Sequence, residues 1–347
     1  MSAKEKIIAL LETVCERKAS DLHISVGSPP TFRIDGALKA GSDQAVSAEE
    51  ATGLAEALLT DENLKKLNEL GEVDFSYSIP ASRFRINIYR QQGHCSIAVR
   101  AIARSVPTLE QLEMPAVIAP LADKPQGLIL VTGPTGSGKS STLAAFINHI
   151  NRTQNKHIIT LEDPIEYVHA SASSIVEQRE VGHDTRSFAN GLRAALRQDP
   201  DVILVGEMRD LETISAAVTA AETGHLVLAT LHTTDAPQTI DRIIDAFPGH
   251  QQAQIRSQLA AVLLTVISQR LLPRASGQGR IAATEILVNS PAVANLIRSE
   301  KVHQIRSVMQ TGRALGMHTL DMSIKELLQK GIVTAAAARP YLTEGVN

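Results

Sequence analysis

The hydrophobic positions at the start of the chain have a helical period. Four apolar residues from Ile7 to Val14 follow one another at i, i+3, i+4 and i+7, which is the spacing of one face of an amphipathic helix. This pattern predicts a first helix that ends near Ala19. Two short strands are predicted next, at residues 21–26 and 32–36, on either side of a Pro-Pro turn.

The next part of the chain has two N-cap residues, and after them the period of the hydrophobic positions changes. Ser47 and Thr60 each stand ahead of a helical pattern, as hydroxyl-bearing N-cap residues do, and predict two further helices. From residue 82 the period changes from 3.6 to 2. Residues 82–89 alternate between an apolar face and a polar face that carries Arg85, which predicts a strand.

A second such strand is predicted at residues 95–102, and it carries Arg100. Together these elements indicate a small α+β domain over residues 1–102, with a polar sheet face that bears arginines. Residues 103–126 contain four prolines among short apolar patches, which is typical of a linker with one or two helical turns. We expect the domain boundary there.

Short, continuous apolar runs dominate the next part of the chain. Each is typical of a buried parallel strand, and helical stretches separate them. The alternation predicts a parallel sheet with right-handed crossovers, whose ligands bind at the carboxyl ends of the strands. The runs lie at residues 127–132, 157–163, 201–207 and 225–232.

The rest of the chain is predicted to be mainly helical. A long amphipathic helix is expected over residues 251–272, and a strand over 280–288 follows it. Two more helices are predicted at 291–298 and 319–330. The sequence has no internal repeat and no low-complexity segment.

The segment GPTGSGKS, between the first apolar run and the helical stretch after it, matches the phosphate-loop pattern G-x-x-x-x-G-K-[ST] without a mismatch. Its glycines let backbone N–H groups turn toward phosphate oxygens, and the helix N-terminus adds partial positive charge. Lys139 would reach the β and γ phosphates, and the Ser140 hydroxyl would complete a Mg²⁺ site. We predict that ATP binds through Gly133, Pro134, Thr135, Gly136, Ser137, Gly138, Lys139, Ser140 and Ser141.

Acidic residues end two of the later apolar runs. Glu207 ends a run of the Walker B type, with Glu in place of Asp, and can hold a water of the Mg²⁺ shell or orient the attacking water. Glu162, Asp163 and Glu166 lie within five residues, where Pro164 turns the chain out of the strand. One of these carboxylates could act as general base or orient water. The alternative is an ordinary surface cluster of acids.

Nearby histidines and arginines leave alternatives open. His225 and His232 begin and end one strand, and their separation of seven residues puts them on opposite faces, so both cannot contact one phosphate. Each is a packed strand histidine or, for His232 above all, a γ-phosphate contact. Arg193 and Arg197 share a helix face at i and i+4. They are solvated, or they neutralise phosphate charge, as arginines from a neighbouring subunit do in many P-loop motors.

Composition excludes several classes of protein. The 347 residues suggest two globular domains. A net charge of −3, no Trp and only 3% aromatic residues argue against a nucleic-acid motor, which favours basic grooves with stacking rings. Cys15 and Cys95 cannot form a disulfide framework or a zinc knuckle. Because no signal peptide and no run of ~18 apolar residues is evident, we expect no direct membrane insertion.

Four sequence boxes together resemble the PilT-type ATPases of the secretion and type IV pilus superfamily, the hexameric motors of bacterial pilus retraction. The resemblance covers nearly the whole chain, beginning with ASDLH at residues 19–23. It rests on the phosphate loop, an Asp box at residues 160–167, a Walker B segment at 197–210 and a His box at 223–234.

The resemblance implies an α/β protein with nucleotide between two domains. The first is an N-terminal PAS-like domain, residues 1–102, joined by the linker to a RecA-like ATPase domain with a parallel sheet, residues 127–272. A strand and a helical tail, residues 273–347, form a C-terminal subdomain. The protein is expected to hydrolyse ATP with Mg²⁺.

The resemblance also implies roles for residues that match the boxes. Glu166 becomes the catalytic glutamate of the Asp box, Glu207 the Walker B acid and His232 a His-box contact. Arginines of the N-terminal domain are brought toward phosphate, which Arg85 and Arg100 match. The expected catalytic residues are Glu162, Glu166, Glu207 and His232; the expected nucleotide contacts outside the loop are Arg85, Arg100, Arg193, Arg197 and His225; Ser140 and Glu207 are expected at Mg²⁺, Glu207 partly through water.

The function that the resemblance implies is pilus retraction and twitching motility by a cytoplasmic homohexamer. Its partner would be a platform protein at the cytoplasmic face of the inner membrane. Extension and secretion ATPases generally carry an extra N-terminal domain and often a four-cysteine zinc insertion, which two distant cysteines cannot form. Ala294, however, stands where retraction ATPases carry Arg in the segment AIRNLIR. An accessory retraction paralogue and an extension or secretion ATPase are the alternatives, with a RecA-like nucleic-acid motor a distant one.

Overall fold

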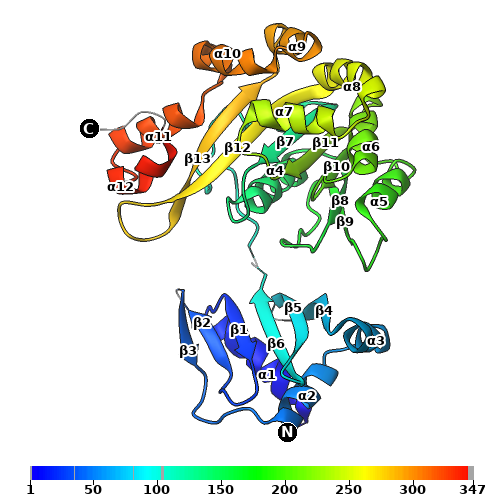
Figure 1. Cartoon of the computed structure of the whole chain (residues 1–347), viewed down its shortest axis with the longest axis vertical. Coiled ribbons are helices and arrows are strands. Elements are labelled where there is room, and N and C mark those ends of the chain that lie inside the picture. Colours follow the sequence, from blue (N-terminus) through cyan, green and yellow to red (C-terminus); the bar gives the residue numbers. More distant parts are fainter. Residues whose placement is uncertain (1, 35, 81, 103–104, 343–347) are drawn as a thin grey trace. The chain divides into compact units, whose positions relative to one another are not determined.

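A computed structural model describes residues 2–34, 36–80, 82–102 and 105–342. The chain divides into two compact units, Met1–Ser105 and Val106–Asn347 (Figure 1). Each unit has its own sheet and its own hydrophobic core. Each is therefore described by itself.

The N-terminal unit has a six-stranded antiparallel sheet in the order β3-β2-β1-β6-β5-β4. Three helices share a core with it, and each begins at an N-cap side chain, Ser2, Ser47 or Thr60, that accepts a backbone N–H of the first turn. The three predicted helices and four predicted strands are confirmed. The elements are α1 (Ala3–Glu16), β1 (Asp21–Ile24), β2 (Thr31–Ile34), β3 (Ala37–Ala40), α2 (Ala48–Glu56), α3 (Asp61–Leu70), β4 (Glu72–Ile79), β5 (Ser82–Gln91) and β6 (His94–Ala101).

Arginines form a row across the polar face of this sheet. In register, Arg33 of β2 lies opposite Asp21 of β1, Asp21 opposite Arg100 of β6, and Arg100 opposite Arg85 of β5. Arg100 Nε donates to Asp21 Oδ1 at 2.9 Å, and Arg85 Nε donates to Asp74 Oδ2 at 2.9 Å. The arginine-bearing face predicted from the alternation is confirmed, and carboxylates on neighbouring strands hold its guanidinium groups.

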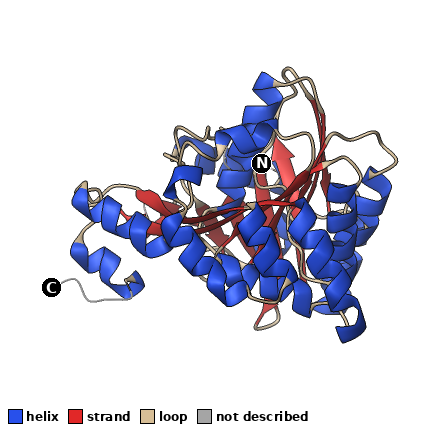
Figure 2. Ribbon diagram, turned by 90° about the horizontal axis from the view of Figure 1, so that it is seen from above, coloured by secondary structure: helices blue, strands red, loops and turns tan. Residues whose placement is uncertain are grey.

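The second unit has a seven-stranded sheet in the order β13-β12-β7-β11-β10-β8-β9, in which only β12 and β13 pair antiparallel (Figures 1 and 2). The strand before the phosphate loop, β7, therefore lies inside the sheet. The elements are η1 (Ala119–Asp123), β7 (Gly127–Thr132), α4 (Lys139–Thr153), β8 (His157–Glu162), β9 (Ile175–Glu180), α5 (Phe188–Ala195), β10 (Val202–Val205), α6 (Leu211–Glu222), β11 (Leu226–Leu231), α7 (Ala236–Asp245), α8 (Gly249–Val262), β12 (Leu263–Pro273), β13 (Arg280–Val288), α9 (Pro291–Arg298), η2 (Val302–Gln304), α10 (Ile305–Thr311), η3 (Arg313–Leu315), α11 (Leu320–Gln329), α12 (Ala335–Ala338) and η4 (Arg339–Tyr341).

Helices cover both faces of this sheet (Figure 2), and β7 illustrates the arrangement. Leu128 and Leu130 belong to a core shared with α5, α6, α7 and α8, whereas Ile129 and Val131 belong to a core shared with η1 and α4. All six residues of β7 are buried. A strand that is apolar on both sides suits a parallel sheet between two helical layers. The expected α/β fold with a RecA-like sheet is confirmed.

The predicted long helix over residues 251–272 is wrong. Helix α8 ends at Val262, and β12 begins at Leu263 with no turn between them. The run after Val262 contains the β-branched residues Thr265, Val266 and Ile267, which pack well on a sheet. It fills the position between β7 and β13, where burial outweighs the helical periodicity. Periodicity alone cannot assign a short apolar run.

The hairpin of β12 and β13 carries the C-terminal helices. Its far end shares a small core with α11 and α12, in which Leu272 and Ile281 meet Ile324. The predicted strand at 280–288 and the helices at 291–298 and 319–330 are confirmed. Within the part of the chain that the structure describes, no helix has the length and apolar character needed to cross a membrane.

Candidate nucleotide-binding site

The phosphate loop connects the end of β7 to the start of α4. Gly133 and Gly138 have φ angles of +141° and +89°, which only glycine adopts readily. A Cβ atom on Gly133 would lie 2.5 Å from the carbonyl oxygen of Gln269 in β12, so no side chain fits there. Because α4 begins at Lys139, its free N–H groups lie at the carboxyl edge of the sheet. This is an anion-binding arrangement.

Lys139 folds back onto its own loop. Its Nζ donates to the carbonyl oxygen of Gly133 at 2.9 Å and to that of Pro134 at 3.1 Å. Burial lowers the pKa of Lys139, and the negative charges of Glu207 and Glu166 act in the opposite direction. The structure therefore brings these three predicted residues within electrostatic reach of one another.

Glu207 follows β10 and meets His232, which follows β11. His232 Nε2 lies 2.9 Å from Glu207 Oε1, and Arg209 donates to the same oxygen. Since β10 and β11 are parallel neighbours, their carboxyl ends place these side chains at one edge. The side chain of Glu207 is 17% exposed and that of His232 is 43% exposed. The histidine is thus the more accessible member of the pair.

The Asp box gives its two glutamates different surroundings. Glu162 Oε1 accepts from Thr160 Oγ1 at 2.6 Å and from Gln178 Nε2 at 3.0 Å. Burial raises the pKa of Glu162, against the effect of these hydrogen bonds. Glu166 is exposed, and its charge reaches Lys139. Glu162 is held inside a hydrogen-bonded network, whereas Glu166 is open to water and to a phosphate.

Two contacts hold the Asp box in place. The hydroxyl groups of Tyr167 and Ser141 lie 2.7 Å apart, which joins the box to the first turn of α4. The backbone N–H of Ile165 donates to Glu180 Oε2 at 3.1 Å, which joins it to β9. The segment that carries Glu166 is therefore anchored on both sides of this residue.

Strand β12 adds residues that the sequence analysis missed because it predicted a helix there. Gln269 is 1% exposed; its Oε1 accepts from Thr142 Oγ1 at 3.0 Å, and its Nε2 donates to the carbonyl oxygen of Ser137 at 2.7 Å. The hydroxyl groups of Thr132 and Ser268 lie 2.7 Å apart one residue earlier. The amide thus binds both the phosphate loop and α4. The sequence signal was a polar Ser-Gln-Arg segment inside an apolar run.

Arg270, the next residue, is a further cation of the site. Its guanidinium group donates to the carbonyl oxygens of Gln269 at 3.1 Å and Thr234 at 3.5 Å. Its charge contributes to lowering the pKa of Lys139. Arg270 therefore lies between the phosphate loop and the His box.

The remaining predicted contacts are His225 and four arginines, and of these His225 lies at the far end of its strand. His225 precedes β11, and its carbonyl oxygen accepts from Gly127 at the start of β7. The length of β11, ~20 Å at 3.3 Å per residue, separates it from the phosphate-loop edge. His225 therefore cannot contact a nucleotide held in the loop of its own chain, contrary to the prediction. Arg193 pairs with Glu212 at 2.8 Å. Arg197 lies four residues further along and donates to the carbonyl oxygen of Arg193 at 3.5 Å. Arg85 and Arg100 belong to the N-terminal unit.

The donor atoms at this edge suit a magnesium ion. Ser140 stands in the first turn of α4 beside Lys139, and Glu207 adds a carboxylate. Hydroxyl and carboxylate oxygens, completed by water and phosphate oxygens, are the ligands that Mg²⁺ takes. Among the described residues, no group of three or more His, Cys, Asp or Glu side chains could hold a metal. Nucleotide and water would therefore supply most of the ligands.

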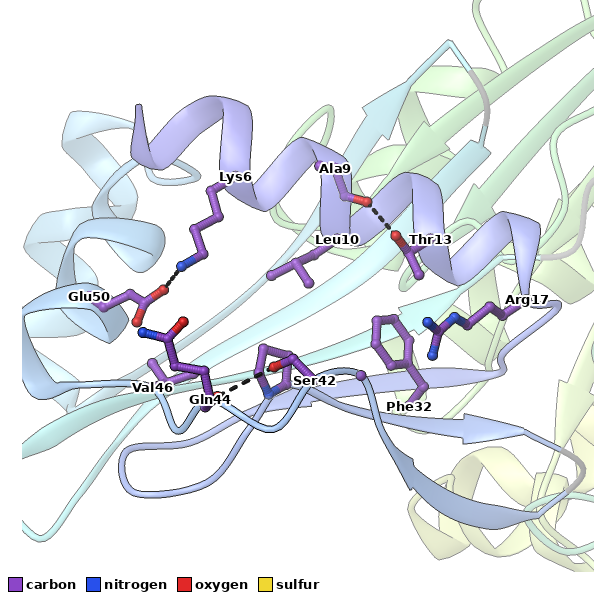
Figure 3. A pocket seen from close by; sticks show the side chains of 12 residues that line it. Lys6, Ala9, Leu10, Thr13, Arg17, Phe32, Ser42, Gln44, Val46 and Glu50 are labelled. Atoms are coloured by element: carbon purple, nitrogen blue, oxygen red, sulfur yellow. Dashed lines mark hydrogen bonds and ion pairs between the residues drawn. The ribbon is translucent and has the colours of Figure 1, made fainter. Parts of the chain in front are cut away.

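The N-terminal unit has a separate hollow of about 320 Å³ between α1 and residues 42–46 (Figure 3). At one end the guanidinium of Arg17 lies 5.2 Å from the ring centroid of Phe32. At the other end Lys6 pairs with Glu50. All the residues that line it belong to this unit, so it is formed without the phosphate loop.

The phosphate loop follows an inner strand of a largely parallel sheet, and the ends of the neighbouring strands carry Glu207 and His232 at the same edge. This arrangement defines a P-loop ATPase with a RecA-like fold. The chain belongs to the family described as "Type II/IV secretion system protein", whose model matches residues 2–339. Within this family, the resemblance to the PilT-type ATPases is confirmed.

Its relatives match along both units. The chain is 49% identical over 334 residues to the "Type IV pilus retractation ATPase PilT" of Pseudomonas aeruginosa, which covers 96% of this chain and 97% of the relative. It is 48% identical over 334 residues to a "Twitching motility protein" of Neisseria gonorrhoeae, covering 96% and 89%. The solved "Crystal Structure of the Pilus Retraction Motor PilT and Bound ADP" superposes with a TM-score of 0.90 at 46% identity, and 96% of each chain is covered.

Proposed function

We propose that this chain is the ATPase motor of type IV pilus retraction and drives twitching motility. The observation that carries the proposal is the cluster of Lys139, Glu166, Glu207 and His232 at one edge of a RecA-like sheet. The similarity over the full length to PilT of Pseudomonas aeruginosa, and to a pilus retraction motor with bound ADP, supports the direction of work.

The phosphate loop holds the β and γ phosphates of ATP in this proposal. A phosphate takes the place of the carbonyl oxygens of Gly133 and Pro134 as the partner of Lys139. Magnesium, held by Ser140 and through water by Glu207, would neutralise phosphate charge. Positioning and charge neutralisation supply most of the rate in phosphoryl transfer.

Two acids divide the work on the attacking water. Glu166 is exposed near Lys139, so its carboxylate orients the water and accepts its proton. Glu162 is already bound by Thr160 and Gln178, so it positions the Asp box instead. His232 connects Glu207 with the γ phosphate, because an imidazole at this edge can form a hydrogen bond with the Glu207 carboxylate or with the phosphate.

The motor works as a homohexamer in this proposal, with neighbouring subunits completing each site. Arg85 and Arg100 form part of an exposed arginine row that suits delivery to a phosphate of another subunit. We propose the same role, delivery to a phosphate of another subunit, for Arg193 and Arg197. The hexamer acts in the cytoplasm on a platform protein at the inner membrane. Mass measurement with ATP and Mg²⁺ tests the assembly, and a monomer at micromolar concentration would contradict it.

A second candidate, an accessory retraction paralogue, is favoured by one observation. Ala294 is 7% exposed and packs in the core beside α8, in the segment where retraction ATPases carry Arg. Deleting the gene and then counting surface pili and measuring their retraction distinguishes the two candidate functions. The main motor predicts more pili that do not retract, an accessory paralogue predicts retraction that persists at reduced load, and bald cells would mark an extension motor.

ATP turnover by the purified protein tests the activity itself. Wild-type protein with ATP and Mg²⁺ should release phosphate, and Lys139→Ala should bind and hydrolyse little or no ATP. Lys124→Ala, which changes an exposed lysine before β7, is the matched control. Turnover by Lys139→Ala at the wild-type rate would reject the assigned site.

A further inference from the structure

One buried carboxylate in β13 joins the starts of two helices. Glu285 is 6% exposed. Its Oε1 accepts the backbone N–H of Ala236, the first residue of α7, at 2.9 Å, and its Oε2 accepts that of Leu320, the first residue of α11, at 3.4 Å. Anionic oxygens at helix N-termini are favourable, because the N–H groups of the first turn lack intrahelical partners.

The α7 end of this connection leads to the nucleotide site. Three hydrogen bonds tie the segment after His232 to the first turns of α7. The hydroxyl groups of Thr233 and Thr239 lie 2.7 Å apart, Thr234 Oγ1 donates to Gln238 Oε1 at 2.6 Å, and Asp235 Oδ1 accepts from the Gln238 N–H at 2.8 Å. A displacement of His232 is therefore passed to the start of α7 rather than absorbed by a slack loop.

The other end leads to the C-terminal helices. The side-chain Oγ of Ser323 in α11 accepts the backbone N–H of Thr284 in β13 at 3.1 Å. His318, just before α11, lies 2.9 Å from the Thr284 hydroxyl and pairs its backbone with Ile286. The start of α11 is thus fastened to β13 on both sides of Glu285.

A cavity of about 240 Å³ beside Glu285 leaves room for movement. The first turn of α7 lines one side, and His303, Arg306 and Met309 line the other. Burial raises the pKa of Glu285, while hydrogen bonds from both helices and the charge of Arg306 act to lower it. Beside this cavity, the carboxylate forms a direct polar bridge between the start of α7, which follows the His box, and the start of α11.

We propose that Glu285 is a positioning residue that transmits the nucleotide state from the His box, through α7, to α11 and the C-terminal helices. The proposal rests on the proposed contact of His232 with the γ phosphate. When the phosphate changes the bond between His232 and Glu207, the start of α7 shifts, and the shared carboxylate moves the start of α11 with it. The two helices respond as a pair because one rigid group accepts from both.

Replacing Leu320 by proline tests this link with little other change. Proline is favoured at the first position of a helix and lacks the N–H that Glu285 accepts. Thr319, the residue before it, has φ −85° and ψ 161°, which suits a residue preceding proline. Leu320→Ala is the matched control, because it removes the same side chain but keeps the N–H. Circular dichroism checks that both variants fold.

The readout is hydrogen exchange in full-length protein, measured on peptides from the phosphate loop and from α11, with and without a non-hydrolysable ATP analogue and Mg²⁺. In wild type and Leu320→Ala, nucleotide should change protection in both peptides. In Leu320→Pro, the phosphate-loop change should persist, and the change in α11 should shrink at least about fivefold, the low end of ordinary coupling between sites. Glu285→Gln, whose amide has one acceptor oxygen, should behave in the same way.

Two results would overturn the link. One is that nucleotide does not change the hydrogen-exchange protection of the α11 peptide in wild type. The other is that nucleotide changes this protection as much in both Leu320→Pro and Glu285→Gln as it does in wild type. Failure of the proposed function looks different, because the phosphate-loop peptide itself would then not respond or phosphate would not be released. If Leu320→Pro does not fold, Glu285→Gln and Ala236→Pro, which removes the α7 donor, decide the matter by the same readout.

Discussion

His232 Nε2 and Glu207 Oε1 lie 2.9 Å apart, although each side chain stands at the end of a different strand. The contact exists because β10 and β11 are parallel neighbours in exact register from Val202–Leu226 to Val205–Ala229. The carboxylate that we propose orients water or the magnesium shell is thereby held in place by a histidine of the neighbouring strand.

Glu207→Gln should keep nucleotide binding and lose turnover. The amide preserves the shape and the contact with His232 but cannot hold a magnesium-bound water as an anion does. We expect kcat to fall by about 10²–10⁴, the range of a lost acid–base group, with the affinity for ATP within a few-fold of wild type. Steady-state phosphate release and nucleotide titration measure these quantities. Glu222→Gln, which changes an exposed carboxylate of α6 that accepts from Gln258, is the control, and equal turnover in both variants would disprove the role of Glu207.

Substitution of the two glutamates of the Asp box should have different effects, one on kcat and the other on the stability of the fold. Glu166→Gln should lower kcat by about 10²–10⁴ and leave the urea midpoint unchanged, because Glu166 is exposed. Glu162→Gln should instead lower stability by ~1–3 kcal/mol, since it disturbs the bonds from Thr160 and Gln178. Phosphate release and urea unfolding on both variants decide. The reverse pattern would make Glu162 the general base.

Gln269→Ala should loosen the phosphate loop without touching the nucleotide. The change leaves the Ser137 carbonyl and the Thr142 hydroxyl without their buried partner. A buried unsatisfied group costs ~1–3 kcal/mol, so we expect kcat/KM for ATP to fall by roughly 10- to 100-fold. Thr265 lies four residues before Gln269 in β12, and Thr265→Val removes its buried hydrogen bond to the Leu287 carbonyl oxygen of β13; this variant should lower stability with kcat/KM nearly unchanged. Equal losses in both variants would show a general effect of the strand.

Acid should destabilise the protein through His169. Burial lowers the pKa of His169 to about 4, so the unfolded chain takes up a proton near pH 6.5 while the folded chain does not. The stability gained by keeping the ring neutral is full above pH 6.5 and is lost as the pH falls from 6.5 toward 4. Urea midpoints should therefore fall less steeply with acid in His169→Gln than in wild type. His250→Gln, at an exposed position, should keep the wild-type slope; equal slopes for all three proteins would contradict the prediction.

Local chemistry explains what the sequence could predict. The phosphate loop, the caps at Ser47 and Thr60 and the apolar runs of β7 and β11 each carry their signal within a few residues, and the structure has all of them. Two of the predicted site acids, Glu166 and Glu207, also meet at Lys139. Strand ends in a parallel sheet share one edge, so this meeting follows from the alternation of strands and helices.

Features that depend on neighbouring strands, rather than on the local sequence pattern, could not be predicted. Strand β9 reads Ile-Val-Glu-Gln-Arg-Glu, and its identity as a strand comes from pairing with β8 at the edge of the sheet. It supplies Gln178 and Glu180, which hold the Asp box. In the same way, the role of Gln269 is not visible in the sequence, because it is the pairing of β12 with β7 that brings this side chain to the Ser137 carbonyl oxygen of the phosphate loop. His225 precedes β11, at the end of the strand opposite the phosphate-loop edge, so its place in the sequence box did not bring it to that edge.

The junction of α8 and β12 has a mechanical consequence. Since the helix ends at Val262 and the strand begins at Leu263, no slack segment lies between them. A pull on α8 is carried directly into a strand that is hydrogen-bonded to β7 on one side and to β13 on the other. Such a load would be shared by many hydrogen bonds in shear, and it would pass within six residues to Ser268 and Gln269, beside the phosphate loop. Helix α8 and the phosphate loop are thus connected mechanically through one sheet.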